Sequence, residues 1–176
     1  MDNSPTLLFC YGLELNLTLL HCVVAGLKPS CHGRALLLDH TMAWNVLGHF
    51  PNALPARGSV LEGALAQLEP QQLQRLQSSR LVPLLYRCRH RTVVTPQGRH
   101  RRALVFSSAD TRPSGTPTFS FWSEVVIGAL ERGLPDGAIE ALLAARPNDR
   151  QQLLRRWSGP WPAAAPTPWM ETRRAA

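Results

Sequence analysis

Short apolar runs that end at turn residues fill the first two thirds of the chain and predict β-strands. The expected strands cover residues 7–10, 33–39, 59–65, 86–95 and 102–107. The last two flank Pro96-Gln97-Gly98, so we expect a hairpin there. Gly63 lies inside the third run, which indicates close approach by another backbone or a ligand.

Residues 40–55 have the composition of a loop. Their turn-forming residues are Asn45, Gly48, Pro51, Asn52 and Pro55. We expect Trp44 and Phe50 to fasten this loop to the core. His49 lies in the same stretch and is a candidate acid or base, although a surface role is the simpler interpretation.

Helical periodicity appears between and after the strands. One helix is expected near Asn16, another begins at Pro70 with Leu73 and Leu76 as its buried stripe, and two more cover 136–145 and 149–157. The apolar positions of a further helix, which ends at Gly133-Leu134-Pro135, are Phe121, Trp122, Val125, Val126 and Leu130. The pattern predicts an α+β domain over residues 1–157, with a small curled or barrel-like mixed β-sheet and flanking helices, followed by a Pro/Ala/Trp-rich tail over 158–176.

Composition is compatible with a single globular domain. The chain has 176 residues, of which 44% are hydrophobic and 18% charged. No apolar run approaches the roughly 20 residues of a membrane span, and the N-terminus lacks the basic region of a signal peptide. We therefore expect a cytoplasmic protein with no membrane contact. The sequence does not indicate an oligomeric state.

The cysteine spacing matches no zinc motif, and no metal or cofactor is expected. A metal site built from His21, Cys22, Cys31 and His32 is rejected, because Cys31 and His32 are adjacent and would point to opposite sides of an extended segment.

The net charge of +7 is concentrated between residues 87 and 102. The arginines of this stretch are Arg87, Arg89, Arg91, Arg99, Arg101 and Arg102. A basic face of this kind is one feature of nucleic-acid-binding proteins. Few aromatic side chains interleave with these arginines, however, and single-stranded nucleic acids stack on such side chains. A solvated strand face is the preferred interpretation, and a nucleic-acid partner is not expected.

The first apolar run enters a turn at Tyr11-Gly12. Successive backbone N–H groups at the end of a buried strand have no ladder partner, and they form a nest that suits a carboxylate. An ordinary turn is the alternative interpretation.

Several separated segments resemble γ-glutamylcyclotransferase-like proteins. The family pattern Tyr-Gly-Ser-Asn-Leu corresponds here to Tyr11-Gly12-Leu13-Glu14-Leu15, and its Val-x-Gly-x-Leu strand corresponds to residues 60–65. A helix then leads to Leu-Asp-x-x-Glu-Gly and Tyr-Arg, which correspond to residues 76–81 and to Tyr86-Arg87. The late pattern Pro-Ser-x-x-Tyr corresponds to residues 117–121, and Gly-Ala and Gly-Leu-Pro follow at 128–129 and 133–135.

The resemblance implies a fold and an activity. Members of the family release an amine from a γ-glutamyl compound when the substrate's own α-amine attacks its γ-carbonyl, and 5-oxoproline forms. The Tyr-Gly loop resembles their cradle for the glutamyl head. The Glu of the family's Glu-Gly pair resembles a general base that takes the proton of the attacking amine and returns it to the leaving nitrogen.

This chain departs from the family pattern at the positions that carry out catalysis and hold the substrate. The general-base position holds Arg80, whose guanidinium stays protonated and accepts no proton. The loop Ser and Asn are Leu13 and Glu14, and the late Tyr is Phe121. Simple γ-glutamyl dipeptides are therefore expected to yield little 5-oxoproline.

Two functions follow from the resemblance. The first is a divergent enzyme that acts on a γ-glutamyl or other amino-acid-derived molecule by cyclisation or amide cleavage. The second is a non-catalytic module that keeps the cavity and binds a small molecule or a partner. In both, the expected ligand is a small molecule bearing a carboxylate.

The candidate site residues follow from the same correspondence. Glu14, Glu62 and Arg80 are the candidate catalytic residues; the loop residue Glu14 is preferred over Glu62, which strand alternation could turn away. Arg80 either pairs with Glu14 or grips the substrate carboxylate. The candidate binding residues are Tyr11, Gly12, Leu13, Leu15, Tyr86 and Phe121.

Overall fold

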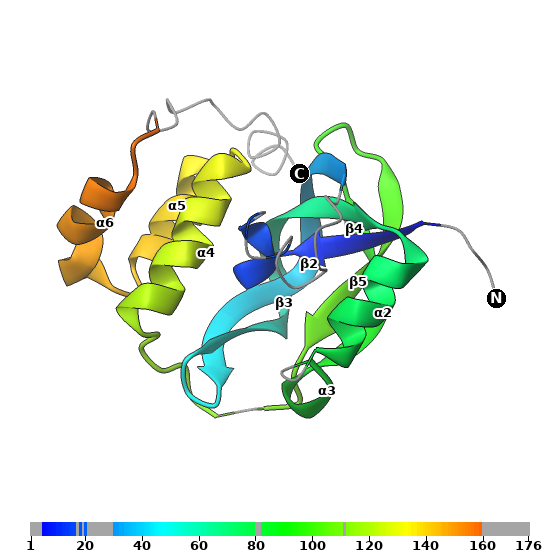
Figure 1. The fold of residues 1–176 in the computed structure, drawn as a ribbon, viewed down its shortest axis with the longest axis horizontal. Coiled ribbons are helices and arrows are strands. Elements are labelled where there is room, and N and C mark those ends of the chain that lie inside the picture. The colour runs from blue at the N-terminus through cyan, green and yellow to red at the C-terminus, as the bar shows by residue number, and fades with distance from the viewer. Residues whose placement is uncertain are drawn as a thin grey trace.

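The computed structural model describes residues 5–16, 18, 20, 30–79, 82–110 and 112–159 (Figure 1). Its strands are β1 (Thr6–Cys10), β2 (Ser30–Val46), β3 (Phe50–Leu68), β4 (Arg87–Val94) and β5 (His100–Ser107). Its helices are η1 (Leu13–Leu15), α2 (Pro70–Ser78), α3 (Val82–Leu85), α4 (Phe119–Glu131), α5 (Asp136–Leu143), η2 (Pro147–Asp149) and α6 (Arg150–Arg156). Arg80 and most of the expected tail lie outside the described residues, as do His21 and Cys22.

The strands form a closed barrel in the order β1-β3-β2-β4-β5. All neighbouring pairs are antiparallel except β1 and β5, which run parallel and meet at Leu8 and Leu104. Figure 1 shows α4, α5 and α6 on one side of the barrel and α2 and α3 on another. The expected α+β fold with a small, barrel-like mixed sheet and flanking helices is confirmed.

The expectation of a loop over residues 40–55 is wrong. The stretch continues β2 and β3 into one long hairpin that turns only at residues 47–49. The ladder absorbs the turn-forming residues through register shifts between Leu38 and His40 and between Ala43 and Val46. Such irregularities let a strand carry proline, which has no N–H to donate.

Two apolar clusters fill the two faces of the sheet, as alternation along each strand requires. The inner cluster fills the barrel with residues from all five strands: Ala35, Leu37, Ala53, Leu61, Leu65, Val93, Ala103 and Val105, together with Phe9 and the ring of Tyr11. The outer cluster joins Leu8, Cys10, Ala64 and Phe106 to helical residues that include Trp122, Val126 and Ile139. The helices therefore cover one outer face of the barrel and bury its apolar side chains.

The start of α2 and the end of α4 agree with the sequence signals, whereas α3 was not expected. Pro70 is the first residue of α2, and Glu69 and Gln72 form a capping box before it. Leu76 of α2 is buried and Leu73 is half-buried. Gly133, with φ of +62°, follows α4 as expected. Among the described residues, none of the helices has both the length and the apolar character that crossing a membrane requires.

Candidate functional site at the end of strand β1

The Tyr11-Gly12 turn forms the expected nest, and the chain's own carboxylate fills it. The Oε1 atom of Glu14 accepts hydrogen bonds from the backbone N–H of Tyr11 at 3.0 Å and of Gly12 at 3.1 Å. Both N–H groups lie just past the last ladder pair of β1, so they have no strand partner. The nest therefore binds a carboxylate, as its geometry suggested.

Burial of the Glu14 side chain raises the pKa of its carboxyl group. The hydrogen bonds from the backbone N–H groups act in the opposite direction but do not cancel this effect. A carboxylate with a raised pKa is a stronger base than an exposed glutamate, so it is better suited to accept a proton near neutrality.

Tyr11 fixes the loop to two other strands. Its hydroxyl donates to the backbone carbonyl of Phe106 on β5 and accepts from the N–H of Ala53 on β3 at 3.1 Å. Burial raises the pKa of the Tyr11 phenol, and the negative charge of Glu14 raises it further. The neutral hydroxyl is thus stabilised as a positioning group.

Pro51 links the loop to the second tyrosine of the site. A Cβ atom at Gly12 would lie 2.8 Å from Cγ of Pro51, so only glycine fits at this close approach. The hydroxyl of Tyr86 donates to the carbonyl of Pro51 at 2.7 Å. Burial raises the pKa of Tyr86, and the charge of Glu14 adds to the shift. Glu14, Tyr11 and Tyr86 therefore share one electrostatic environment.

Two buried asparagines support this region, and the sequence pattern did not single them out as site residues. Oδ1 of Asn52 accepts from the N–H of Ser108 at 2.8 Å, and Nδ2 of Asn45 donates to the carbonyl of Asp110 at 2.9 Å. Both side chains are fully buried. They hold the segment after β5 against the β2–β3 hairpin, next to Pro51.

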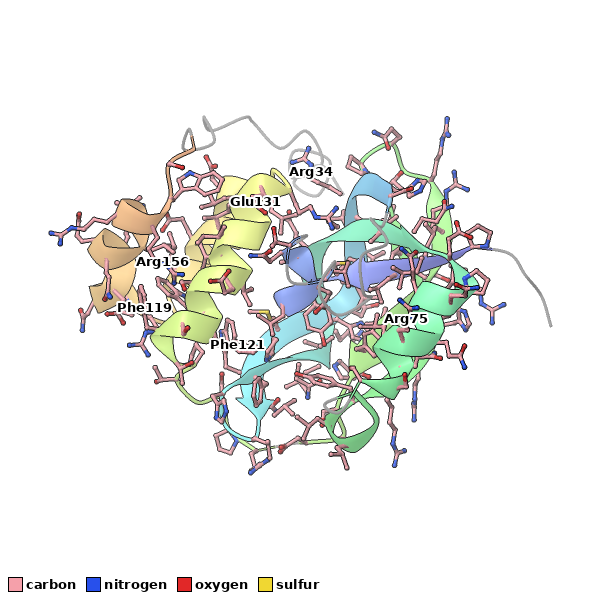
Figure 2. The ribbon with its side chains drawn as sticks, viewed as in Figure 1. Arg34, Arg75, Phe119, Phe121, Glu131 and Arg156 are labelled. Atoms are coloured by element: carbon pink, nitrogen blue, oxygen red, sulfur yellow. The ribbon has the colours of Figure 1, made fainter. Side chains whose placement is uncertain are left out.

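Phe121 belongs to an aromatic cluster that joins α4 to the β2–β3 hairpin. It projects from α4 (Figure 2) and makes edge contacts with Phe50, at 4.8 Å between ring centroids, and with Trp44, at 6.4 Å. His49, in the hairpin turn, packs its ring on Phe50 at 4.4 Å. Trp44 and Phe50 thus contact α4 as anchoring residues, although from strands and not from a loop.

The helix η1 attaches the loop to α4. Leu15 is buried in the outer cluster, and Leu13 is half-buried against it. The guanidinium of Arg132 donates from Nε to the carbonyl of Leu15 at 3.2 Å, and Gly128 packs against the backbone of Leu15 and Asn16. The position of Glu14 therefore depends on how closely α4 approaches.

Glu62 lies on β3 opposite Leu36, one residue away from the inward-facing Leu61. The alternation of the strand directs it to the outer face, whereas Tyr11 belongs to the inner cluster. Burial raises the pKa of Glu62 to about 7, and the nearby charge of Arg34 acts against the shift. No direct contact joins Glu62 to Glu14 in the described part of the chain. Its catalytic role, like that of Arg80, stays a prediction.

Replacing Glu62 with Gln is expected to flatten the dependence of stability on pH between the unfolded value of about 4.3 and about 7. Because the folded chain binds this proton more tightly than the unfolded chain, the free energy of unfolding should fall as pH rises through that interval in the wild type. Urea unfolding across the interval measures the slope. An unchanged slope in Glu62→Gln would contradict the assignment.

Within the ranges that the structure describes, no three His, Cys, Asp or Glu side chains gather as they would around a metal ion. The arrangement at Glu14 suits proton transfer and carboxylate binding. Its hydrogen-bonding groups are two backbone N–H groups, two phenol hydroxyls and one carboxyl group.

Solved structures share this architecture. A γ-glutamyl cyclotransferase superposes with a TM-score of 0.73 at 19% sequence identity, over 98% of this chain and 100% of its own. The chain has the γ-glutamylcyclotransferase-like fold. An uncharacterized human protein matches with a TM-score of 0.73 at 20% identity, over 92% of this chain and 94% of its own.

YkqA from Bacillus subtilis is similar over a smaller share of its length. It matches with a TM-score of 0.69 at 22% identity, over 82% of this chain and 55% of its own. Neither models of protein families nor curated protein sequences give a match. The resemblance seen in the motifs is therefore confirmed at the level of the fold.

Proposed function

We propose that the chain is a divergent γ-glutamylcyclotransferase-like enzyme. Its substrate is a γ-glutamyl compound or another amino-acid-derived small molecule, and the reaction is intramolecular cyclisation or amide cleavage. The observation that carries the proposal is the carboxyl group of Glu14, which burial makes more basic, at the loop where the fold's cyclotransferase motif begins.

The chemistry requires one group that moves a proton. The substrate's α-amine attacks its own γ-carbonyl, and a C–N bond forms while the amine loses a proton to the Glu14 carboxylate. The same proton passes to the leaving nitrogen as the original amide bond breaks, so 5-oxoproline and a free amine result. Because the attack is intramolecular, holding the substrate in a folded conformation supplies much of the rate.

The surrounding residues would act by position. Tyr11 and Tyr86 remain neutral hydroxyls that donate to backbone carbonyls, so they position the backbone around Glu14 and do not compete for its proton. Leu13 and Phe121 replace polar residues of the family pattern, which makes the surroundings of the reacting amide more apolar. Arg80 would grip the substrate carboxylate with two parallel hydrogen bonds.

The test is a panel of γ-glutamyl amines, γ-glutamyl dipeptides and amino-acid amides, with 5-oxoproline and released amine followed by mass spectrometry. We expect release from at least one class, and turnover of simple dipeptides well below the typical enzymatic rate of about ten per second. Rapid turnover of simple dipeptides would contradict the altered centre.

A second function is favoured by one specific observation, namely that Glu14 already occupies the nest. A non-catalytic module that retains the fold's cavity would tolerate this occupancy. Thermal shift separates the two functions. A ligand from the panel that raises the melting temperature but releases no amine would support the binding module and count against the enzyme.

A further inference from the structure

A cavity of about 360 Å³ opens at the end of the barrel away from Glu14. Its lining residues are Leu7, His32, Leu65, Gln67, Thr95, Gln97, Arg99 and Arg101. Leu7 lies near the start of β1 and pairs with Gln67, whereas Tyr11 and Glu14 follow the end of the same strand. Figure 1 shows β1 running from the side of the N-terminus toward α4, so the two sites lie at opposite ends of the strand.

The lining continues the inward-facing positions of the barrel. We call the open end of this cavity, lined by Thr95, Arg99 and Arg101, the mouth. In steps of two residues toward the mouth, Ala103 of the inner cluster is followed by Arg101 and then by Arg99. In the same way Val93 leads to Thr95, and Leu65 leads to Gln67. The barrel interior thus changes from apolar to polar at this end, with Leu65 as the apolar floor.

The polar groups of the mouth are predominantly hydrogen-bond donors. Two guanidinium groups and two side-chain amides line the cavity, and no carboxylate does. Within the described part of the chain, neither Arg99 nor Arg101 forms an ion pair. The hydroxyl oxygen of Thr95 is buried and has no hydrogen-bond partner there. A buried hydroxyl without a partner is costly, and an anionic ligand would supply its acceptor.

The turn that carries these groups is internally hydrogen-bonded. The N–H of Thr95 donates to the carbonyl of Arg99 at 2.9 Å, and the N–H of Gly98 donates to the carbonyl of Thr95 at 2.9 Å. Gly98 has a φ of +72°, which lets the turn close without strain. The backbone from Thr95 to Arg99 is therefore ordered before any ligand binds.

We propose that this mouth is a binding site for the phosphomonoester group of a small molecule. Arginine forks match the geometry of phosphate oxygens, and the Thr95 hydroxyl and the amides of Gln67 and Gln97 supply further donors. A phosphomonoester presents three terminal oxygens and close to two negative charges, which use this donor set more fully than a carboxylate does. The volume lies within the usual range for small-molecule pockets of roughly 300–1,000 Å³.

The site is separate from Glu14, so its test does not depend on catalysis. Isothermal titration of the full chain with glycerol phosphate, inorganic phosphate and glycerol compares the phosphoryl group with its parent alcohol. We expect heat of binding with the two phosphates and none with glycerol. Arg99→Gln combined with Arg101→Gln should weaken phosphate binding at least about tenfold, because charge-assisted hydrogen bonds to phosphate are lost.

Arg89→Gln combined with Arg91→Gln is the matched control, because it removes the same charge from exposed positions of the same hairpin outside the cavity. It should leave phosphate affinity within about twofold. Thr95→Val keeps the branched shape and removes only the hydroxyl, so it should weaken phosphate binding several-fold. Melting temperatures without ligand show that each variant is folded.

Three results would overturn the proposal. Equal losses in the cavity variant and in the matched control would indicate a diffuse basic surface. Binding of acetate as tight as that of glycerol phosphate would remove the preference for phosphate. Tight, salt-dependent binding of an oligonucleotide that lacks a terminal phosphate, with no binding of glycerol phosphate, would identify a nucleic-acid surface instead.

Discussion

Replacing Glu14 with Gln is expected to abolish most turnover and at the same time to stabilise the fold above neutral pH. Turnover of the best panel substrate should fall by about a hundred- to ten-thousand-fold, because an amide does not accept the amine's proton. Stability should rise because the Gln carbonyl still accepts both N–H groups at Oε1, whereas the cost of burying an ionised carboxyl disappears.

The raised pKa of Glu14 determines whether stability rises or falls with pH. Burial raises the pKa of the Glu14 carboxyl, so the folded chain binds its proton more tightly than the unfolded chain does. The free energy of unfolding of the wild type therefore falls as pH rises from about 4.3 through the raised pKa, and the loss is complete above it. In Glu14→Gln the contribution of Glu14 to this decrease should be absent while that of Glu62 remains, and the gain over wild type should be largest at alkaline pH.

Glu14→Ala is the control for the hydrogen bonds. It leaves the N–H groups of Tyr11 and Gly12 without their acceptor, which should lower the free energy of unfolding by about 1–3 kcal/mol. Urea unfolding of the three proteins over a range of pH separates charge from hydrogen bonding. If Glu14→Gln turned over as fast as wild type, Glu14 would have only a structural role.

Replacing Gly128 with Ala is expected to destabilise the fold by about 1–3 kcal/mol, the usual cost of overpacking a core. The new Cβ would lie 2.4 Å from the backbone nitrogen of Asn16 and 2.6 Å from the carbonyl carbon of Leu15. Both contacts are with backbone, so α4 and η1 must separate. The displacement should also disturb Glu14 and weaken ligand binding at the nest.

Gly137→Ala provides a matched substitution in the neighbouring helix α5. A Cβ at Gly137 meets no atom within 4 Å, so this change should leave stability equal or raise it by up to about 1 kcal/mol. Denaturant midpoints of the two variants give the comparison. Equal midpoints would show that η1 moves away from α4 without cost.

The sequence predicted the barrel because its strands carry strong local patterns. Phe9, Leu65 and Val93 occupy apolar runs, and they face the same interior. The hairpin over residues 40–55 was hidden because Pro51, Asn52 and Pro55 have turn-like propensity, and only the ladder with β2 compensates for it. Propensity of this kind is overridden by long-range pairing, which a single sequence does not display.

The site was predicted only in part for the same reason. Tyr11, Gly12 and Glu14 are close in sequence, so the nest followed from local geometry. Pro51 reaches it through a strand about forty residues away, and no local signal marks that contact. The sequence showed the arginines of the mouth only as a charged stretch. Strand alternation places Arg101 toward the cavity only when the strands form a closed barrel, which the sequence alone does not show.

The Glu14 side chain in the nest is, in effect, a tethered competitor for any incoming carboxylate. A group held by so short a linker has an effective concentration of millimolar order or higher, so a free anion must outcompete it to bind. Weak carboxylate ligands would then be invisible to the wild type and would become detectable in Glu14→Ala. Formate or acetate should restore part of the stability lost in that variant, which would turn the vacated nest into a sensor for small anions.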